Sequence, residues 1–266
     1  MSVNLKLRAL LIGINYIGSR NELKGCINDV NNSLDFIIKK YGFQKENIRI
    51  LTDNTAIRPT KDNIITGMKW LVDGNDEHSR LFLHYSGHGS YMKDTDNNEP
   101  SGYDQLICPV DLEQNGFITD DTMKTILVDS LHEQAKLTVL FDDCHSGTAL
   151  DLRYNFKVNV LTPERFSYST CVINAFDSKS KGNAILFAGC RDEETSADAF
   201  INGKSQGAMT FSFLQAFTEL EKTGKPITYK KMLKCIQSTL KNNGYSQDIQ
   251  LSFANKTDIN SVFTLL

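Results

Sequence analysis

The sequence has few prolines and no segment that would divide it into separate parts. Its 266 residues include five prolines and 17 glycines, and these do not gather with serine into a linker. A hydrophobic content of 40% is enough for one large buried sheet, or for two small domains. Because no linker is present, we expect a single α/β domain over residues 1–266.

Signals for export and for membrane insertion are also missing. The segment from Met1 to Lys6 leads directly into a strand pattern, without the apolar stretch and cleavage site of a secretory signal. No apolar run approaches the length of a membrane-spanning helix. We therefore expect a cytoplasmic protein that has no membrane partner.

Cysteine use and charge exclude further classes. The six cysteines have no paired short spacings, which argues against a zinc ribbon or a disulfide framework and favours a reducing compartment. A balance of 29 basic and 32 acidic residues gives a formal net charge of −3, without the basic excess that binding of nucleic acid requires. The sequence therefore predicts no nucleic-acid partner.

Several short motifs are incomplete. Gly203-Lys204-Ser205 is not a phosphate loop, because Asp198 stands where its first glycine belongs. An EF-hand beginning at Asp94 fails, since Glu99 replaces the required glycine and Gln105 the bidentate glutamate. No Gly-x-Ser-x-Gly elbow is present, which weakens the hypothesis of a serine hydrolase on an α/β sheet.

Apolar runs and amphipathic segments alternate along the chain. Leu7 to Ile14 is nearly continuous in apolar residues, which is typical of a strand buried on both faces. Similar runs predict strands at 48–51, 81–85, 137–141, 184–188 and 249–253, and periodic segments predict helices at 26–40, 60–72, 123–131, 209–220 and 230–240. The segment from Tyr154 to Lys181 has no clear period, and we expect a loop there. The order indicates a mostly parallel central sheet with helices on both faces.

Two of these strands end in motifs that hold a cysteine and a histidine. Leu137 to Phe141 leads into Asp142-Asp143-Cys144-His145, and Leu81 to Tyr85 leads into Ser86-Gly87-His88-Gly89. The carboxyl ends of parallel strands meet at one edge of a sheet, so Cys144 and His88 should come together. A thiol needs a nearby base to act as a thiolate. The pattern predicts Cys144 as nucleophile and His88 as general acid/base, with the nearby His84 a structural residue inside its strand.

Four motifs in this order resemble the metacaspases, cysteine peptidases of the caspase group. They are Leu23 to Asp29, Tyr85 to Ser90, Phe141 to Gly147 and Ser205 to Phe211. The separation of His88 from Cys144, 144 − 88 = 56 residues, is similar to the caspase arrangement. The resemblance implies a caspase-like fold with a catalytic block at about 1–153, a loop at about 154–182 and a smaller block at about 183–266. It also implies the type with a short interblock loop and no prodomain.

The resemblance implies an endopeptidase that cleaves after Arg or Lys through a Cys–His dyad. The backbone N–H groups of Gly89 and Cys144 would stabilise the oxyanion. The expected acidic pocket consists of Asp29 and Asp142 with Cys26 and Ser86 nearby. A buried carboxylate pair favours a cationic side chain, because the cation offsets the cost of burying the two negative charges. From the residues alone, Asp29 could equally stabilise a helix N-terminus, and Asp142 could be a surface carboxylate.

Acidic residues gather between Asp94 and Asp121, and the simplest interpretation is a solvated loop. The resemblance implies instead that Asp104, Asp120, Asp121 and Asp151 bind calcium, which prefers oxygen ligands, and we expect them on loops. Activity should then require Ca2+. Self-cleavage is expected after a basic residue in or beside the aperiodic segment; the candidates are Arg153, Lys157, Arg165, Lys179 and Lys181.

A second interpretation from another class is a catalytically weak or inactive caspase-fold scaffold or interaction protein. The intact His88 and Cys144 argue against it. The main prediction is a monomer that acts on protein or peptide substrates with Arg or Lys before the cleaved bond.

Overall fold

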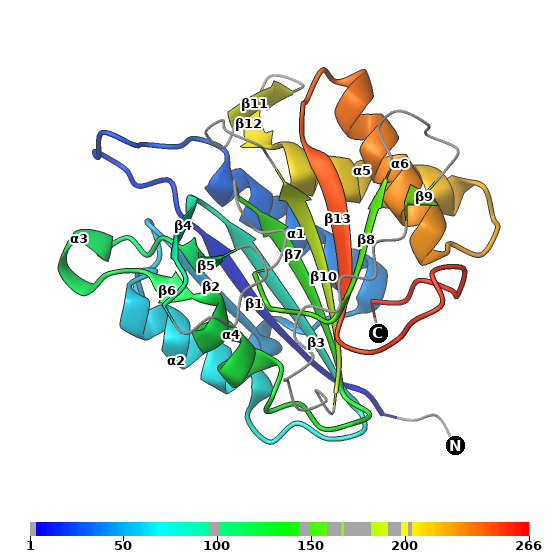
Figure 1. The fold of residues 1–266 in the computed structure, drawn as a ribbon, viewed down its shortest axis with the longest axis horizontal. Helices are drawn as coiled ribbons and strands as arrows, with labels where there is room; N and C mark the ends of the chain where they lie inside the picture. Colours follow the sequence, from blue (N-terminus) through cyan, green and yellow to red (C-terminus); the bar gives the residue numbers. More distant parts are fainter. Residues whose placement is uncertain are drawn as a thin grey trace.

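The computed structural model describes residues 4–95, 102–143, 149–158, 166–167, 182–190, 198–201 and 204–265. Its centre is an eight-stranded sheet in the order β2-β1-β3-β7-β10-β13-β8-β9 (Figure 1). The strands are β1 (Lys6–Gly13), β2 (Ile48–Thr52), β3 (Ser79–Ser86), β7 (Lys136–Asp142), β8 (Tyr154–Val158), β9 (Phe166–Ser167), β10 (Asn183–Cys190) and β13 (Asp248–Phe253). The first five strands of that order are parallel, and β13, β8 and β9 each pair antiparallel with the strand before.

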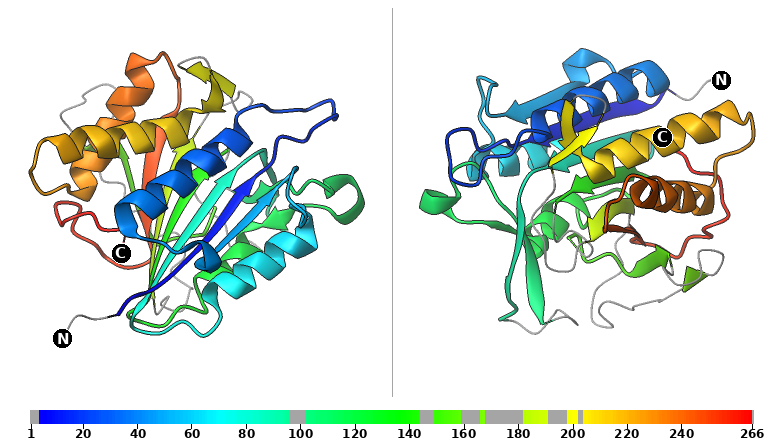
Figure 2. Two further views of the ribbon diagram at one scale, coloured as in Figure 1. Left: turned by 180° about the vertical axis from the view of Figure 1, so that it is seen from behind. Right: turned by 90° about the horizontal axis from the view of Figure 1, so that it is seen from above.

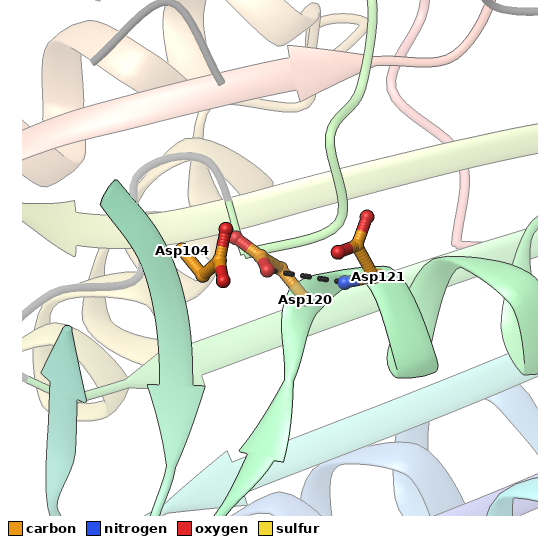
Figure 3. Close-up of side chains that lie close together, drawn as sticks. All are labelled: Asp104, Asp120 and Asp121. Carbon is orange, nitrogen blue, oxygen red and sulfur yellow. Dashed lines mark hydrogen bonds between the residues drawn. The ribbon is translucent and has the colours of Figure 1, made fainter. Parts of the chain in front are cut away.

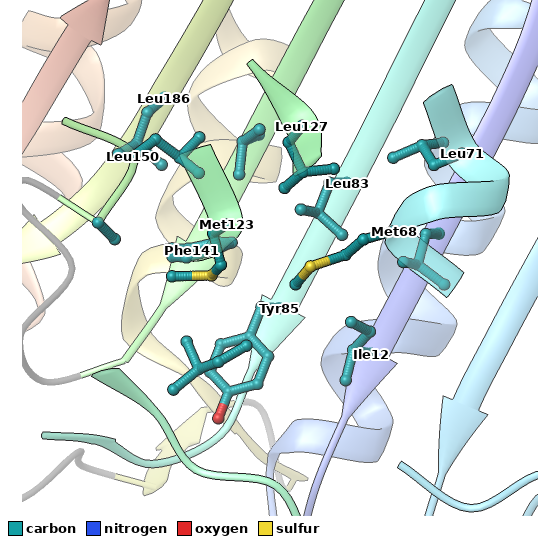
Figure 4. Close-up of a cluster of buried hydrophobic side chains, with 14 of the residues drawn as sticks. Ile12, Met68, Leu71, Leu83, Tyr85, Met123, Leu127, Phe141, Leu150 and Leu186 are labelled. Carbon is teal, nitrogen blue, oxygen red and sulfur yellow. The ribbon is translucent and has the colours of Figure 1, made fainter. Parts of the chain in front are cut away.

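Helices cover both faces of the sheet (Figure 2). They are α1 (Cys26–Tyr41), α2 (Lys61–Val72), α4 (Asp120–Leu127), α5 (Ala208–Lys222) and α6 (Tyr229–Asn242). Successive side chains of a strand point to opposite faces, so Leu83 and Phe82 of β3 belong to different cores. Leu83 shares its core with α2 and α4 (Figure 4), whereas Phe82 packs with residues of α1, α5 and α6. The predicted mostly parallel sheet with helices on both faces is confirmed.

Helix ends follow local signals in the sequence. Thr60, the predicted cap of α2, accepts a hydrogen bond from the N–H of Asn63. Gly42 ends α1 in the left-handed region, at a φ of 72°. At α4 the sequence prediction was wrong by about one turn, because Thr119 caps the helix and Asp120 and Asp121 form its first turn.

Smaller elements complete the structure. β4 (Gly89–Lys93), β5 (Tyr103–Ile107) and β6 (Ile118–Thr119) form a three-stranded sheet, and β11 (Asp198–Ile201) and β12 (Lys204–Gly207) form a hairpin. A four-residue helix α3 (Leu112–Asn115) and a 3-10 turn η1 (Lys45–Asn47) lie in connections. None of these short elements was predicted. β4 matters for the site, because it begins directly after His88.

The expected loop at 154–181 was wrong for its first part. Residues 154–158 form β8, whose Phe156 pairs with Leu251 of β13. Of the remaining residues the structure describes only β9, at 166–167. Within the described ranges, no helix has both the length and the apolar character that crossing a membrane requires.

Candidate active site

The strand-end motifs lie at the same edge of the sheet. β3 and β7 are parallel neighbours, with Ser86 directly opposite Asp142, and the N–H of Gly87 donates to the Asp142 carbonyl at 3.4 Å. A methyl group added to Gly89 would lie 2.9 Å from Cγ of Asp143, so the two motifs are in contact. Cys144 itself lies outside the described residues.

His84 and His88 have different environments. His84 is fully buried in β3, with Nε2 3.1 Å from Oγ1 of Thr210, and burial lowers its pKa to about 3. A ring held neutral inside the sheet is a structural residue, as the sequence predicted. His88 is half-buried beyond the end of the strand, at the edge that the cysteine motif shares.

A backbone carbonyl orients the imidazole of His88. Its Nε2 lies 2.7 Å from the carbonyl oxygen of Asn21, in the loop between β1 and α1. A carbonyl can only accept, so Nε2 carries the hydrogen and Nδ1 of the neutral ring is the basic nitrogen. Sequence reasoning missed this partner, because any residue type can supply a backbone carbonyl.

Asp29 is held at the N-terminal end of α5. The N–H of Gly207 donates to both carboxylate oxygens of Asp29 at 2.9 Å, and the hydroxyl of Ser86 donates to Oδ2 at 2.8 Å. Asp29 also lies in the first turn of α1. Helix N-termini favour negative charge, so Asp29 lies where two helices stabilise its carboxylate, and this position is compatible with a place in the acidic pocket.

Asp142 reaches the same place from the end of β7. Its Oδ2 accepts the N–H of Thr210 at 2.6 Å. A methyl group added to Gly207 would lie 2.1 Å from Oδ2 of Asp142 and 2.8 Å from Oδ2 of Asp29, so both carboxylates border on Gly207. Asp142 is 6% exposed, which excludes the surface-carboxylate alternative.

The four residues of the expected acidic pocket are all buried. Asp29 is 0%, Ser86 1%, Cys26 5% and Asp142 6% exposed. Cys26 is the first residue of α1, one helical turn before Asp29. The structure thus brings the carboxylates and Ser86 together around Gly207, which the sequence prediction did not include.

Three of the four expected calcium ligands gather in one cluster. Asp104, Asp120 and Asp121 each offer a carboxylate oxygen, and these oxygens lie within 4.8 Å of one another (Figure 3). Asp120 accepts the N–H groups of Gln105 at 2.7 Å and Asp121 at 3.1 Å. The expectation that these residues lie on loops was wrong, because Asp104 is in β5 and the other two begin α4.

Asp151 adds negative charge to this cluster. Burial raises the pKa of Asp120 to about 8, and the charge of Asp151 is the next largest cause. Asp151 is buried and takes a φ of 47°, a conformation that is uncommon for a residue other than glycine. Four carboxylates from a strand, a helix start and a loop form a set of oxygen donors that suits a hard divalent cation such as Ca2+.

Comparisons with known proteins agree with this geometry. The family model described as metacaspase, peptidase C14 domain, matches residues 7–153. Metacaspase-1 of Scheffersomyces stipitis is 39% identical, over 97% of this chain and 73% of its own length. Metacaspase-1 of Meyerozyma guilliermondii is 37% identical, over 97% of this chain and 72% of its own length.

Two solved structures share the fold. A protein from Geobacter sulfurreducens superposes with a TM-score of 0.65 at 22% identity, over 97% of each chain. The structure of pro-sf-caspase-1 has a TM-score of 0.51 at 9% identity and covers 98% of this chain and 91% of its own. Fold and sequence together define a cysteine-type endopeptidase with a caspase-like α/β fold. The chain belongs to the metacaspase family.

Proposed function

We propose that this peptidase is activated by calcium and cleaves after Arg or Lys, with Cys144 as nucleophile and His88 as general acid/base. The observation that carries the proposal is the convergence of Asp29 and Asp142 on Gly207, at the sheet edge where the strand leading to His88 ends.

The dyad chemistry starts from the tautomer of His88 that Asn21 supports. With Nε2–H bonded to the Asn21 carbonyl, Nδ1 can accept the thiol proton of Cys144. The thiolate sulfur then attacks the carbonyl carbon, and the N–H groups of Gly89 and Cys144 bind the developing oxyanion. His88 returns the proton to the leaving amine as the C–N bond breaks. Water hydrolyses the remaining thioester with His88 as the base, which restores the thiol.

The acidic pair supports specificity for a basic side chain. Gly207, Thr210 and Ser86 donate hydrogen bonds to the two carboxylates and thereby stabilise their ionised forms despite burial. Two buried carboxylates attract an Arg or Lys side chain electrostatically, whereas an acidic side chain would be repelled. The pair therefore selects by charge.

The acidic cluster supports calcium binding. Asp104, Asp120, Asp121 and Asp151 would hold the ion, whose contribution there is to neutralise their mutual repulsion. Asp104 lies in β5, and β5 pairs with the strand β4 that follows His88. The ion would thus act on the element next to His88, while the bond-making steps are carried out by the protein's own side chains.

The test is a panel of fluorogenic peptides that end in Arg, Lys or Asp, measured with excess Ca2+ and with chelator. We expect cleavage of the Arg and Lys peptides only, dependent on Ca2+ and absent in Cys144→Ala. Asp142→Asn should lower kcat/KM for the Arg peptide by about two orders of magnitude or more, because a buried cation loses part of its counter-charge. Asp73→Asn, at an exposed carboxylate, is the matched control and should match the unmodified protein. Equal cleavage after Asp and Arg would reject the pocket, and full activity in chelator would reject the calcium requirement.

A further inference from the structure

The loop between β1 and α1 packs against His88 through Tyr16 and Asn21. The rings of Tyr16 and His88 are in contact, with centroids 4.7 Å apart and planes at 37°. Oη of Tyr16 accepts the backbone N–H of His88 at 3.0 Å. The same loop supplies the Asn21 carbonyl that binds Nε2. One loop therefore contacts both the backbone and the side chain of His88.

Two buried phenol groups bridge His88 to Cys108, the residue after β5. The hydroxyl of Tyr16 donates to the Cys108 carbonyl at 2.6 Å, and the hydroxyl of Tyr85 donates to the His88 carbonyl at 2.7 Å. The N–H of Cys108 lies 3.3 Å from Oη of Tyr85, and the two hydroxyl oxygens are 3.3 Å apart. Both the N–H and the C=O of His88 are thus bonded to a tyrosine hydroxyl. Burial raises the pKa of each phenol well above its ordinary value, so both remain donors at neutral pH.

The backbone of Tyr16 is held in an uncommon conformation. Its φ is 51°, in the left-handed region that a bulky residue enters only under constraint. The carboxylate of Asp53, after β2, accepts the N–H groups on both sides of it, from Asn15 at 2.7 Å and from Ile17 at 3.3 Å. Asp53 therefore fixes the turn that directs the phenol ring toward His88.

We infer that Tyr16 is a positioning residue for His88, and that Asp53 acts through it. The inference rests on the proposed catalytic role of His88. Its physical basis is that proton transfer from a thiol requires the imidazole to be aligned to within a fraction of an ångström, and a misplacement of about 1 Å costs on the order of 100-fold in rate. The hydrogen bond from the His88 N–H to Oη of Tyr16 fixes the backbone position of His88, and the ring contact fixes the orientation of its imidazole.

The test compares Tyr16→Phe with Tyr229→Phe. The second substitution removes the hydroxyl of another buried tyrosine, in α6 and bonded to the backbone of Thr264, so it controls for the loss of a buried hydrogen bond. We would measure kcat and KM separately on an Arg peptide with Ca2+, and the rate of Cys144 alkylation by iodoacetamide against pH, read by mass spectrometry. His88→Ala serves as the reference for loss of the base.

Tyr16→Phe should lower kcat by about 10- to 100-fold with KM within about twofold, and should move the alkylation profile toward alkaline pH. Tyr229→Phe should keep the unmodified kcat and profile. Unchanged kcat and an unchanged profile in Tyr16→Phe, with His88→Ala inactive, would overturn the inference and leave the dyad intact. An active His88→Ala would instead reject the proposed role of His88.

A second variant keeps the inference testable if Tyr16→Phe does not fold. Asp53→Ala leaves the phenol in place but removes the acceptor that fixes its turn, and should lower kcat in the same direction. Asp76→Ala is its matched control, because Asp76 accepts the N–H of His78 in the connection that precedes β3, at the other end of that strand from His88. Equal kcat in the two aspartate variants would contradict the inference.

Discussion

His84 and His88 are four residues apart, yet the two imidazoles lie in different environments. His84 is fully buried and its pKa is lowered to about 3, whereas His88, four residues later, is half-buried beside the cysteine motif. The sequence predicted that His84 is a structural residue inside an apolar run, which its burial confirms, and placed His88 between two glycines beyond that run. Periodicity is enough for that distinction, since strand interiors exclude water.

Burial of His84 predicts acid sensitivity. Its folded pKa of about 3 is below the unfolded value of 6.5, so the unfolded state binds more protons between these pH values and the free energy of unfolding falls as pH decreases through this window. The loss is about 1.4 kcal/mol per pH unit, or roughly 2 kcal/mol at pH 5. Urea denaturation at pH 7.5, 6 and 5 should show a flatter pH dependence for His84→Gln than for the unmodified protein. His78→Gln, whose side chain is 44% exposed, is the control and should keep the original slope. A slope for His84→Gln parallel to that of the unmodified protein would contradict the prediction.

The close packing around Gly207 predicts that Gly207→Ala impairs substrate specificity. A methyl group there would lie 2.1 Å from Oδ2 of Asp142, so Gly207→Ala must displace the carboxylates. We expect kcat/KM for Arg and Lys peptides to fall by about 100-fold, with a stability loss of about 1–3 kcal/mol. The alkylation rate of Cys144 should fall much less than kcat/KM, because it depends on His88 and not on binding of a basic side chain.

Gly67→Ala in α2 is the matched control for Gly207→Ala. Its added methyl meets the flexible end of Leu10 at 3.0 Å, far from the acidic pair in the sequence and in the other core. It should change stability without changing kcat/KM. Equal peptide cleavage by both alanine variants would show that Gly207 does not determine the pocket.

At the scale of elements, β8 and the start of α4 have local sequence patterns that predict them, whereas β6 has none. In the sequence of β8, Tyr154, Phe156 and Val158 alternate with the polar residues Asn155 and Lys157. This period of two predicts a strand. α4 begins with Thr119 before two acidic residues, an ordinary N-cap pattern. By contrast, β6 has two residues, and its pairing with β5 follows from tertiary contacts that no local pattern encodes. The small sheet that carries Asp104 is therefore not predictable from the local sequence.

The start of α4 predicts how calcium and pH interact. The folded pKa of Asp120 is about 8 against the ordinary 3.8, so without a cation the folded state binds the extra proton, and stability falls as pH rises between these values. Thermal unfolding in EDTA should therefore show a lower Tm at pH 8 than at pH 6, and Ca2+ should raise the Tm most at pH 8. Asp120→Asn should lose both effects.

The control for Asp120→Asn is Asp62→Asn, an exposed acidic residue in the first turn of α2. It should keep the calcium response. A full calcium shift of Tm in Asp120→Asn, or none in the unmodified protein, would show that the acidic cluster does not bind the ion.

At the scale of the whole molecule, the central sheet combines strands from the N-terminal and C-terminal parts of the chain. β10 lies between β7 and β13, so strands on both sides of the 154–182 segment share one hydrogen-bonded array (Figure 1). The apolar runs of the sequence were sufficient to predict these strands. They were not sufficient to predict that β12 and α5 would complete the acidic pair, because the donors there are backbone N–H groups.

This arrangement predicts the products of self-cleavage. Lys157 lies in β8 and pairs with Gln250, so cleavage after it requires part of the sheet to open, and we expect no cut there. We expect cuts at other candidate basic residues when Ca2+ is added, identified by mass spectrometry of the fragments. A nicked chain should elute in gel filtration as one particle of unchanged size, because β7 and β10 remain paired. Cleavage after Lys157, or separation of the fragments without denaturant, would contradict the prediction.

The bonds between Asp29 and Gly207 have a consequence for the timing of activity in a newly made chain. The two partners are 178 positions apart in the sequence. When a ribosome has released the chain as far as the cysteine motif, both His88 and Cys144 have been synthesised, but the N–H donors that orient the acidic pair have not. Domains generally fold as the chain emerges from its N-terminus. A nascent chain should therefore be unable to select basic substrates until α5 has formed.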